Sequence, residues 1–378
     1  MRTAVSRAPD AERVVSPLEL FFDLVYVFAI GQLSHHLVAH VNLRTGAETA
    51  ILALAVFYAW YMTAWGANWL DPDRPAVRGL FVGLMFASLL MSVAIDDAFG
   101  GRAWLFVTGY LILQVGRATF LIVALRGRPQ SEHFVNDLVW ELIAGVLWVA
   151  GAIATGDARL ILWGLAVTVA YGGAWALHWL PGRGVRVDAR HTEIAGGHLV
   201  ERFRLFFIIV LGETVLTTGN AFAGQPFELE RLLALAIGFT GTVALWWCYF
   251  QRAEPLGIER VEAADDAGAI GLWATRTLTL IVLALIGIAV ADELAIAHPG
   301  DDVTLGFAIL AFGGPALFLV AQLLFHGEVF GQVSRSRLLG LAALAILAIA
   351  TAPLTLIVGI AASTAVIVAV ATADTVRP

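Results

Sequence analysis

Apolar runs of about 20 residues recur along the whole chain, separated by short stretches rich in charged residues, Pro or Gly. A helix of that length crosses the hydrocarbon core of a bilayer, which is roughly 30 Å thick. The pattern therefore predicts an all-α, polytopic membrane helical bundle with about twelve transmembrane helices. The expected spans are 18–39, 48–69, 77–97, 103–125, 136–154, 159–180, 201–221, 231–251, 270–293, 303–325, 337–351 and 353–372. Since little separates the last two runs, one kinked or re-entrant element is the alternative for that pair.

Composition supports a membrane protein. The chain is 59% hydrophobic and 14% charged, with a mean hydropathy of +0.82, values outside the range of soluble globular proteins. No short apolar segment with a cleavage site precedes the first span, so no cleaved signal peptide is expected. Cys248 is the only cysteine, which excludes an intramolecular disulfide. The expected partners are the lipid bilayer and an unknown small solute or ion, and no nucleic acid.

The positive residues predict the orientation. All 23 are Arg; with alternating spans, seventeen fall on the side of the N-terminus and four on the other, while Arg117 and Arg276 lie within spans. Because positive residues favour the cytoplasmic side, both termini are predicted to be cytoplasmic.

The chain also contains an internal similarity. The stretch ELFFDLVYVFAIGQ from Glu19 resembles ERFRLFFIIVLGET from Glu201, which aligns Gln32 with Glu213, although similar apolar helices can mimic a repeat by chance. Two related six-helix halves with the same orientation are therefore predicted. The expected segments are a cytoplasmic N-terminal segment 1–16, a first half 17–180, an Arg-rich cytoplasmic loop 181–199, a second half 200–372 and a cytoplasmic tail 373–378.

Ionisable side chains within spans are candidates for function, because they normally face the protein interior or a wet cavity. Glu213 is the preferred one, since it lies about 12 residues, hence roughly 18 Å, from the inner end of its helix. The candidates for a substrate or ion pathway are Glu213, Asp23, Gln32, His35, His36, Glu19, Glu201, Thr217 and Asn220.

The same side chains can instead hold helices together. Asp23 is expected to pair with Arg276, or with Arg202 and Arg204, if it has only this structural role. Arg117 and Glu141 fall at similar depth and are interpreted as a structural salt bridge. Near the outer ends of spans, an acidic rim is interpreted as solvated loop charge, with cation concentration at an entrance as the alternative. The rim consists of Asp96, Asp97, Asp292, Glu293, Asp301 and Asp302.

Several kinds of chemistry find no support. His36 and His40 have the spacing of helical metal ligands, but no nearby carboxylate completes a set, so no metal site is predicted. No nucleotide-binding or nucleophile motif stands in a suitable context. Consequently no cofactor and no catalytic residue are assigned, and an enzyme is not the preferred interpretation.

Two stretches resemble a known family. ELFFDLVYVFAIGQLSHHL from Glu19 and ERFRLFFIIVLGETVL from Glu201 look like the two signatures of the bacterial low temperature requirement protein A family. The resemblance implies a multi-pass protein of the bacterial plasma (inner) membrane, linked in name to growth in the cold, and implies no substrate. Arg204 departs from the family pattern, which has a smaller or uncharged residue there. The matching positions are Glu19, Phe21, Phe22, Asp23, Leu24, Gln32, Leu33, His35, Glu201, Arg202, Gly212 and Glu213.

Three functions are compatible with these observations. The preferred one is a secondary transporter or ion-conducting protein that uses buried carboxylates. The first alternative is a non-transporting membrane factor in cold or envelope stress adaptation, with the polar residues linking helices. The second is an intramembrane enzyme that modifies lipid, which requires Asp23, His35, His36 and Glu213 to converge.

Overall fold

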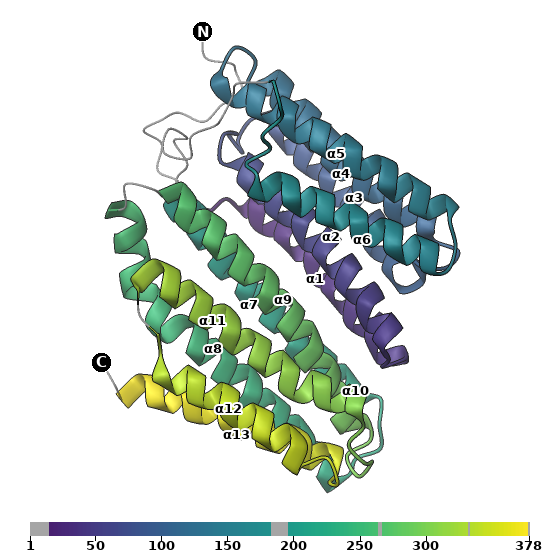
Figure 1. Cartoon of the computed structure of the whole chain (residues 1–378), viewed down its shortest axis with the longest axis vertical. Coiled ribbons are helices and arrows are strands. Elements are labelled where there is room, and N and C mark those ends of the chain that lie inside the picture. The colour runs from purple at the N-terminus through teal and green to yellow at the C-terminus, as the bar shows by residue number, and fades with distance from the viewer. Residues whose placement is uncertain (1–14, 183–195, 264–266, 332, 377–378) are drawn as a thin grey trace. The chain divides into compact units, whose positions relative to one another are not determined.

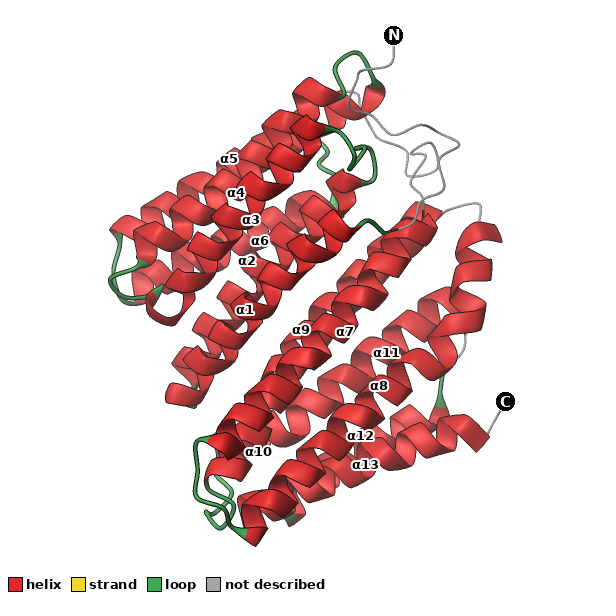
Figure 2. Cartoon of the chain, turned by 180° about the vertical axis from the view of Figure 1, so that it is seen from behind, coloured by secondary structure: helices red, strands yellow, loops and turns green. Residues whose placement is uncertain are grey.

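The structure is a computed structural model that describes residues 15–182, 196–263, 267–331 and 333–376 (Figure 1). Within these ranges the chain is all-helical and contains no β-strand (Figure 2). Most of the predicted N-terminal segment and of the Arg-rich loop, and the end of the predicted tail, lie outside the described residues.

The helices follow the predicted apolar runs. The first six are α1 (Pro17–Ala39), α2 (Leu43–Ala67), α3 (Pro75–Ala94, followed by a 3-10 turn, Ile95–Asp97), α4 (Ala103–Ala124), α5 (Pro129–Ile153) and α6 (Asp157–Trp175). The others are α7 (Gly196–Ala223), α8 (Leu229–Ala263), α9 (Ala267–Ala297), α10 (Leu305–Ala308), the π-helical segment η2 (Ile309–Gly313), α11 (Gly314–Phe330), α12 (Arg335–Ala350) and α13 (Leu356–Val376). Since α10, η2 and α11 run on without a break, they occupy one predicted span.

Eleven helices in the described ranges are long and apolar enough to cross a membrane. The twelfth predicted span, α12, is shorter, with 16 residues. It rises about 24 Å at 1.5 Å per residue, less than the thickness of a typical hydrocarbon core. Pro353 follows its C-terminal turn, and α12 and α13 are separate helices. A single kinked helix is therefore excluded, whereas a full crossing by α12 stays a prediction and a re-entrant pair stays its alternative.

The chain divides into two compact units. The first consists of residues 1–33, 47–202 and 265–269, and in it the consecutive helices α3 to α6 pack side by side. The second consists of residues 34–46, 203–264 and 270–378, and in it α13 packs along α8 and α12. Helix α7 starts in the first unit and continues in the second beyond Arg202.

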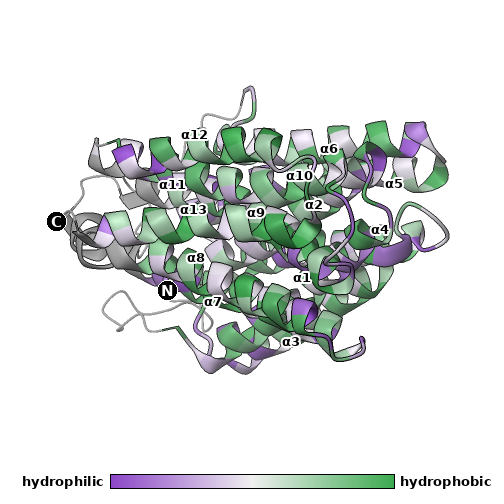
Figure 3. Cartoon of the chain, turned by 90° about the horizontal axis from the view of Figure 1, so that it is seen from below, coloured by the Kyte–Doolittle hydropathy of each residue, from purple (hydrophilic) through white to green (hydrophobic). Residues whose placement is uncertain are grey.

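Large apolar side chains are exposed on many of the helices. Phe86, Val146, Ile153 and Ile161 are each more than 60% exposed. Apolar residues cover the helices along most of their length (Figure 3). Since soluble proteins rarely expose extensive apolar surface, this pattern is that of helices surrounded by lipid.

Helices α3 and α4 approach closely at Gly109. A Cβ atom there would lie 2.8 Å from the carbonyl oxygen of Ala87 and 2.8 Å from the backbone nitrogen of Met91. We expect Gly109→Ala to lower the free energy of unfolding by about 1 to 3 kcal/mol, because backbone atoms of α3 must move. Gly116→Ala, on the same helix with nothing within 4 Å, is the matched control. It should be neutral or mildly stabilising. Thermal unfolding in detergent measures both, and equal behaviour of the two variants contradicts the close packing.

Candidate functional site

The two signature helices meet in a buried ion-pair cluster formed by Glu19, Asp23, His198 and Arg202. Arg202 donates a hydrogen bond to Asp23 and lies 3.9 Å from the Glu19 carboxylate. His198 Nε2 lies 3.3 Å from Glu19 Oε1. All four side chains are buried, and all belong to the first unit. Of the pairings considered from sequence, the structure has the one between Asp23 and Arg202.

Neighbouring side chains extend this α1–α7 cluster onto α2. Trp60 Nε1 donates a hydrogen bond of 2.7 Å to Asp23 Oδ1, and the guanidinium of Arg202 lies 5.7 Å from the centre of the Trp60 ring. Asn68 Oδ1 lies 3.1 Å from His198 Nδ1. Because these contacts link three helices, the cluster has a structural role in the first unit.

A second buried cluster lies between α4, α5 and the chain after α6. Arg117 Nη2 donates a hydrogen bond of 3.0 Å to Asp137 Oδ2. The predicted salt bridge between Arg117 and Glu141 is therefore wrong in its partner: Glu141 Oε1 accepts a hydrogen bond from Gln114 instead. The α4–α5 cluster thus has one arginine facing two carboxyl groups, one helical turn apart.

His178 completes the α4–α5 cluster from a loop. Its Nε2 lies 3.4 Å from Asp137 Oδ1, and Leu177 and His178 both have left-handed backbone, each with φ of 52°. Burial, with the Arg117 charge, lowers the pKa of His178 to about 3, so the imidazole is neutral near pH 7. Two consecutive non-glycine residues in this conformation are strained, which indicates that the contacts of the buried imidazole hold the loop in place.

The second unit has a comparable buried group at the ends of α11, α12 and α13. Arg337 Nη2 lies 3.3 Å from Asp374 Oδ2, and Arg337 Nη1 lies 2.8 Å from His326 Nδ1. All three side chains are buried. Sequence reasoning assigned no role to any of the three, because each stands alone near the end of an apolar run.

Glu213 differs from these carboxylates because it has no cationic partner among the described residues. It is 8% exposed, in the middle of α7, and accepts a hydrogen bond of 3.1 Å from Thr217. The charged group that acts on it is another carboxylate, Glu293 of α9, which in turn interacts electrostatically with His35 near the end of α1. We call Glu213, Thr217, Glu293 and His35 the Glu213 group, and all four lie in the second unit.

The remaining predicted residues lie elsewhere on their helices. Gln32, His36 and Glu201 are half-buried, and Asn220 is exposed. The guanidinium of Arg276 lies 4.9 Å from the centre of the Trp273 ring. Among the pathway candidates, the described contacts bring together Glu19 with Asp23 through Arg202, and Glu213 with Thr217.

The prediction that the acidic rim consists of solvated loop charge is only partly correct. Asp96, Asp97, Asp301 and Asp302 are exposed, as expected for solvated charge. Asp292 is instead 5% exposed and lies inside α9, which continues to Ala297. The interpretation as loop charge is therefore wrong for Asp292.

The described residues contain eleven apolar helices of membrane-crossing length, exposed apolar side chains on many helices, and buried ion pairs between helices. Together these features define a multi-pass helical membrane protein. A family model agrees with the two signatures and extends over nearly the whole chain. Residues 14–372 match the bacterial low temperature requirement A protein (LtrA) family, and the chain belongs to that family.

The chain is also similar to a curated protein. The chain is 35% identical over 310 residues to "Uncharacterized protein RA0937" of Rhizobium meliloti (strain 1021), an alignment that covers 81% of this chain and 75% of the relative. No solved structure matches the chain significantly.

Proposed function

We propose that this protein is a secondary transporter or ion-conducting protein of the bacterial plasma membrane, in which Glu213 carries a proton or a cation. The observation that supports it is the contrast between the buried carboxylates. Asp23 and Asp137 each have an arginine partner, whereas Glu213 has none among the described residues. A role as an ion-pair link between helices accounts for the first two and does not account for the third.

The neighbours of Glu213 suit a step in an ion pathway. A carboxylate close to a second carboxylate favours occupancy by a positive charge, because the two negative charges repel each other in a low-dielectric environment. The charge of Glu293 acts on Glu213, and the charge of His35 acts on Glu293. In the proposed pathway, Glu213 of α7 and Glu293 of α9 are the two groups that bind the proton or cation.

The proposal includes the predicted orientation and duplication, which the excess of Arg on one side and the signature similarity support. Each unit also has a buried cluster of one Arg, one Asp and one His that comes from its fourth, fifth and sixth helical segments, although the order of the three residue types along the chain differs. In the first unit these are Arg117, Asp137 and His178, and in the second His326, Arg337 and Asp374. Two clusters of the same composition on corresponding helices are compatible with two halves of common origin.

The alternatives draw on other observations. The ion-pair clusters would serve a non-transporting membrane factor equally well, since they link helices. A lipid-modifying enzyme requires Asp23, His35, His36 and Glu213 to converge, and the described hydrogen-bond partners of Asp23 are Arg202 and Trp60. A requirement for Glu213 in ion flux therefore distinguishes the transport function from the two alternatives.

Flux through liposomes tests the proposal. We expect purified protein to move protons, read by a pH-sensitive dye in the lumen, or monovalent cations, read by radioactive tracers. Glu213→Gln should reduce the flux to that of protein-free liposomes. It should leave the protein folded, because the amide oxygen of Gln can still accept the hydrogen bond from Thr217.

The matched control is Glu230→Gln, which removes an exposed carboxylate and should preserve the flux. Full flux in Glu213→Gln would show that transport does not require the Glu213 carboxylate. An absence of flux in folded wild-type protein would contradict transport itself, and unfolding of Glu213→Gln would support the structural alternative.

A further inference from the structure

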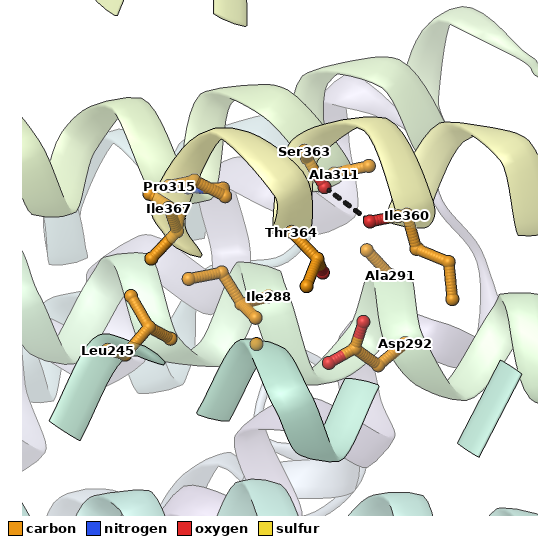
Figure 4. A pocket seen from close by; sticks show the side chains of 11 residues that line it. Leu245, Ile288, Ala291, Asp292, Ala311, Pro315, Ile360, Ser363, Thr364 and Ile367 are labelled. Carbon is orange, nitrogen blue, oxygen red and sulfur yellow. Dashed lines mark hydrogen bonds between the residues drawn. The ribbon is translucent and has the colours of Figure 1, made fainter. Parts of the chain in front are cut away.

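Asp292 lines a cavity enclosed by α8, α9, η2, α11 and α13 (Figure 4). The cavity volume is about 20 Å³, counted as the space that the centre of a water molecule can occupy. This is enough for one water molecule or an ion of similar size. All of its lining residues belong to the second unit. Asp292 is 5% exposed and has no hydrogen bond or ion pair to the described residues, so its charge is without compensation from the protein.

Two residues of α13 with hydroxyl groups also line the cavity. Figure 4 shows Ser363 and Thr364 on the α13 side of the cavity and the carboxylate of Asp292 on the α9 side. Ser363 Oγ donates its hydrogen to the carbonyl oxygen of Ile360 at 3.1 Å, so the oxygen lone pairs remain available to a cation.

The helical backbone is irregular where it lines the cavity. The π-helical segment η2 ends just before Pro315, and Ala311 and Pro315 both line the cavity. Proline has no N–H, so the carbonyl of Ala311, four residues earlier, lacks its usual α-helical donor. Such breaks in helical hydrogen bonding are frequent at functional sites.

Two glycines of α8 provide the space. A Cβ atom at Gly238 would lie 3.2 Å from the carboxyl carbon of Asp292, and one at Gly241 would lie 3.1 Å from Thr364 Oγ1. Gly238 and Gly241 are three residues apart and therefore share a face of the helix. A larger residue at either position would press on an oxygen-bearing side chain of the cavity.

We infer that this cavity is a binding site for one small monovalent cation of the size of Na⁺, held by Asp292, the hydroxyl groups of Ser363 and Thr364, and the carbonyl of Ala311. Oxygen donors alone suit a hard cation, and a single carboxylate balances a single positive charge in a buried site. The described residues contain no group of three or more His, Cys, Asp or Glu that suits a transition metal. A role of this cation as the coupling ion rests on the proposed transport function. Binding of the cation to the cavity can be measured without any flux.

Binding of radioactive Na⁺ to the purified full-length protein in detergent, in choline chloride at constant ionic strength, tests the inference. We expect saturable binding of about one ion per chain in the wild type. Asp292→Asn should abolish it, and Asp302→Asn, which removes an exposed carboxylate, should preserve it. Thr364→Val keeps the shape of the side chain and should weaken binding at least about tenfold, the effect of losing about 1.4 kcal/mol.

Absence of saturable binding in folded wild-type protein would overturn the site, and so would full binding in Asp292→Asn. If Asp292→Asn does not fold, unchanged affinity in Thr364→Val overturns it equally. Proton uptake at Asp292 without any Na⁺ binding would replace the cation by a proton and also refute the inference. Because Glu213 does not line the cavity, saturable Na⁺ binding by folded wild-type protein that shows no flux would support this inference and contradict only the proposed function.

Discussion

Replacing Arg202 by Met is expected to lower the free energy of unfolding by about 3 to 5 kcal/mol, the usual cost of leaving a buried charge without its partner. Arg202 is fully buried, and it is the guanidinium that faces both Asp23 and Glu19. Methionine has a similar length and fills much of the same space, so the loss of charge dominates the effect. The Trp60 N–H would remain as the hydrogen-bond donor to Asp23.

A double variant separates charge from packing in the same cluster. Asp23→Asn combined with Arg202→Met removes both charges and should recover most of the lost stability. The control is Arg74→Gln, whose ion pair with Asp71 is exposed and should be worth at most about 1 kcal/mol. Thermal or denaturant unfolding in detergent measures all of them. A loss below about 1 kcal/mol in Arg202→Met would show that this ion pair does not hold α1 to α7.

The helices themselves were predictable, because a bilayer imposes one length and one polarity on every span. The run 103–125 corresponds to α4, Ala103–Ala124. The differences arise where a helix continues beyond its apolar run: the predicted span 231–251 is only part of α8, Leu229–Ala263. Hydropathy reports the part of a helix that lies in lipid, and it contains little information about where the backbone hydrogen bonding ends.

The same effect explains the residues that sequence analysis placed wrongly or missed. Asp137 stood at the edge of a predicted span that began at 136, but α5 begins at Pro129, so Asp137 lies about 12 Å inside the helix. Asp292 stood at the end of a predicted span, but α9 continues for more than a turn beyond it. Ion-pair partners are also hard to predict, because Asp137 and Glu141 share one helix face at a spacing of four residues. His178 gave no signal, since its position depends on left-handed backbone at two residues that rarely adopt it.

The α4–α5 cluster allows a test of which carboxylate pairs with Arg117. Arg117→Met leaves Asp137 and Glu141 buried without an arginine, and it should lower the free energy of unfolding by about 3 to 5 kcal/mol. Asp137→Asn on its own should cost a comparable amount, because Arg117 then loses its ion pair. The two substitutions together should be much less harmful than their sum. Arg126→Gln, which removes an exposed charge just after α4, should change stability by less than about 0.5 kcal/mol.

Glu141→Gln is the decisive comparison in this series. Its amide oxygen can still accept the hydrogen bond that Gln114 donates at 3.2 Å, and the salt bridge between Arg117 and Asp137 is untouched. Removing the second of two carboxyl groups also relieves repulsion in a buried site with one arginine. We therefore expect unfolding measurements to show little loss, or a gain, for Glu141→Gln, in contrast to Asp137→Asn. If the two variants lose equal stability, Arg117 interacts with both carboxylates alike. That result would support the predicted ion pair between Arg117 and Glu141 as well as the one with Asp137.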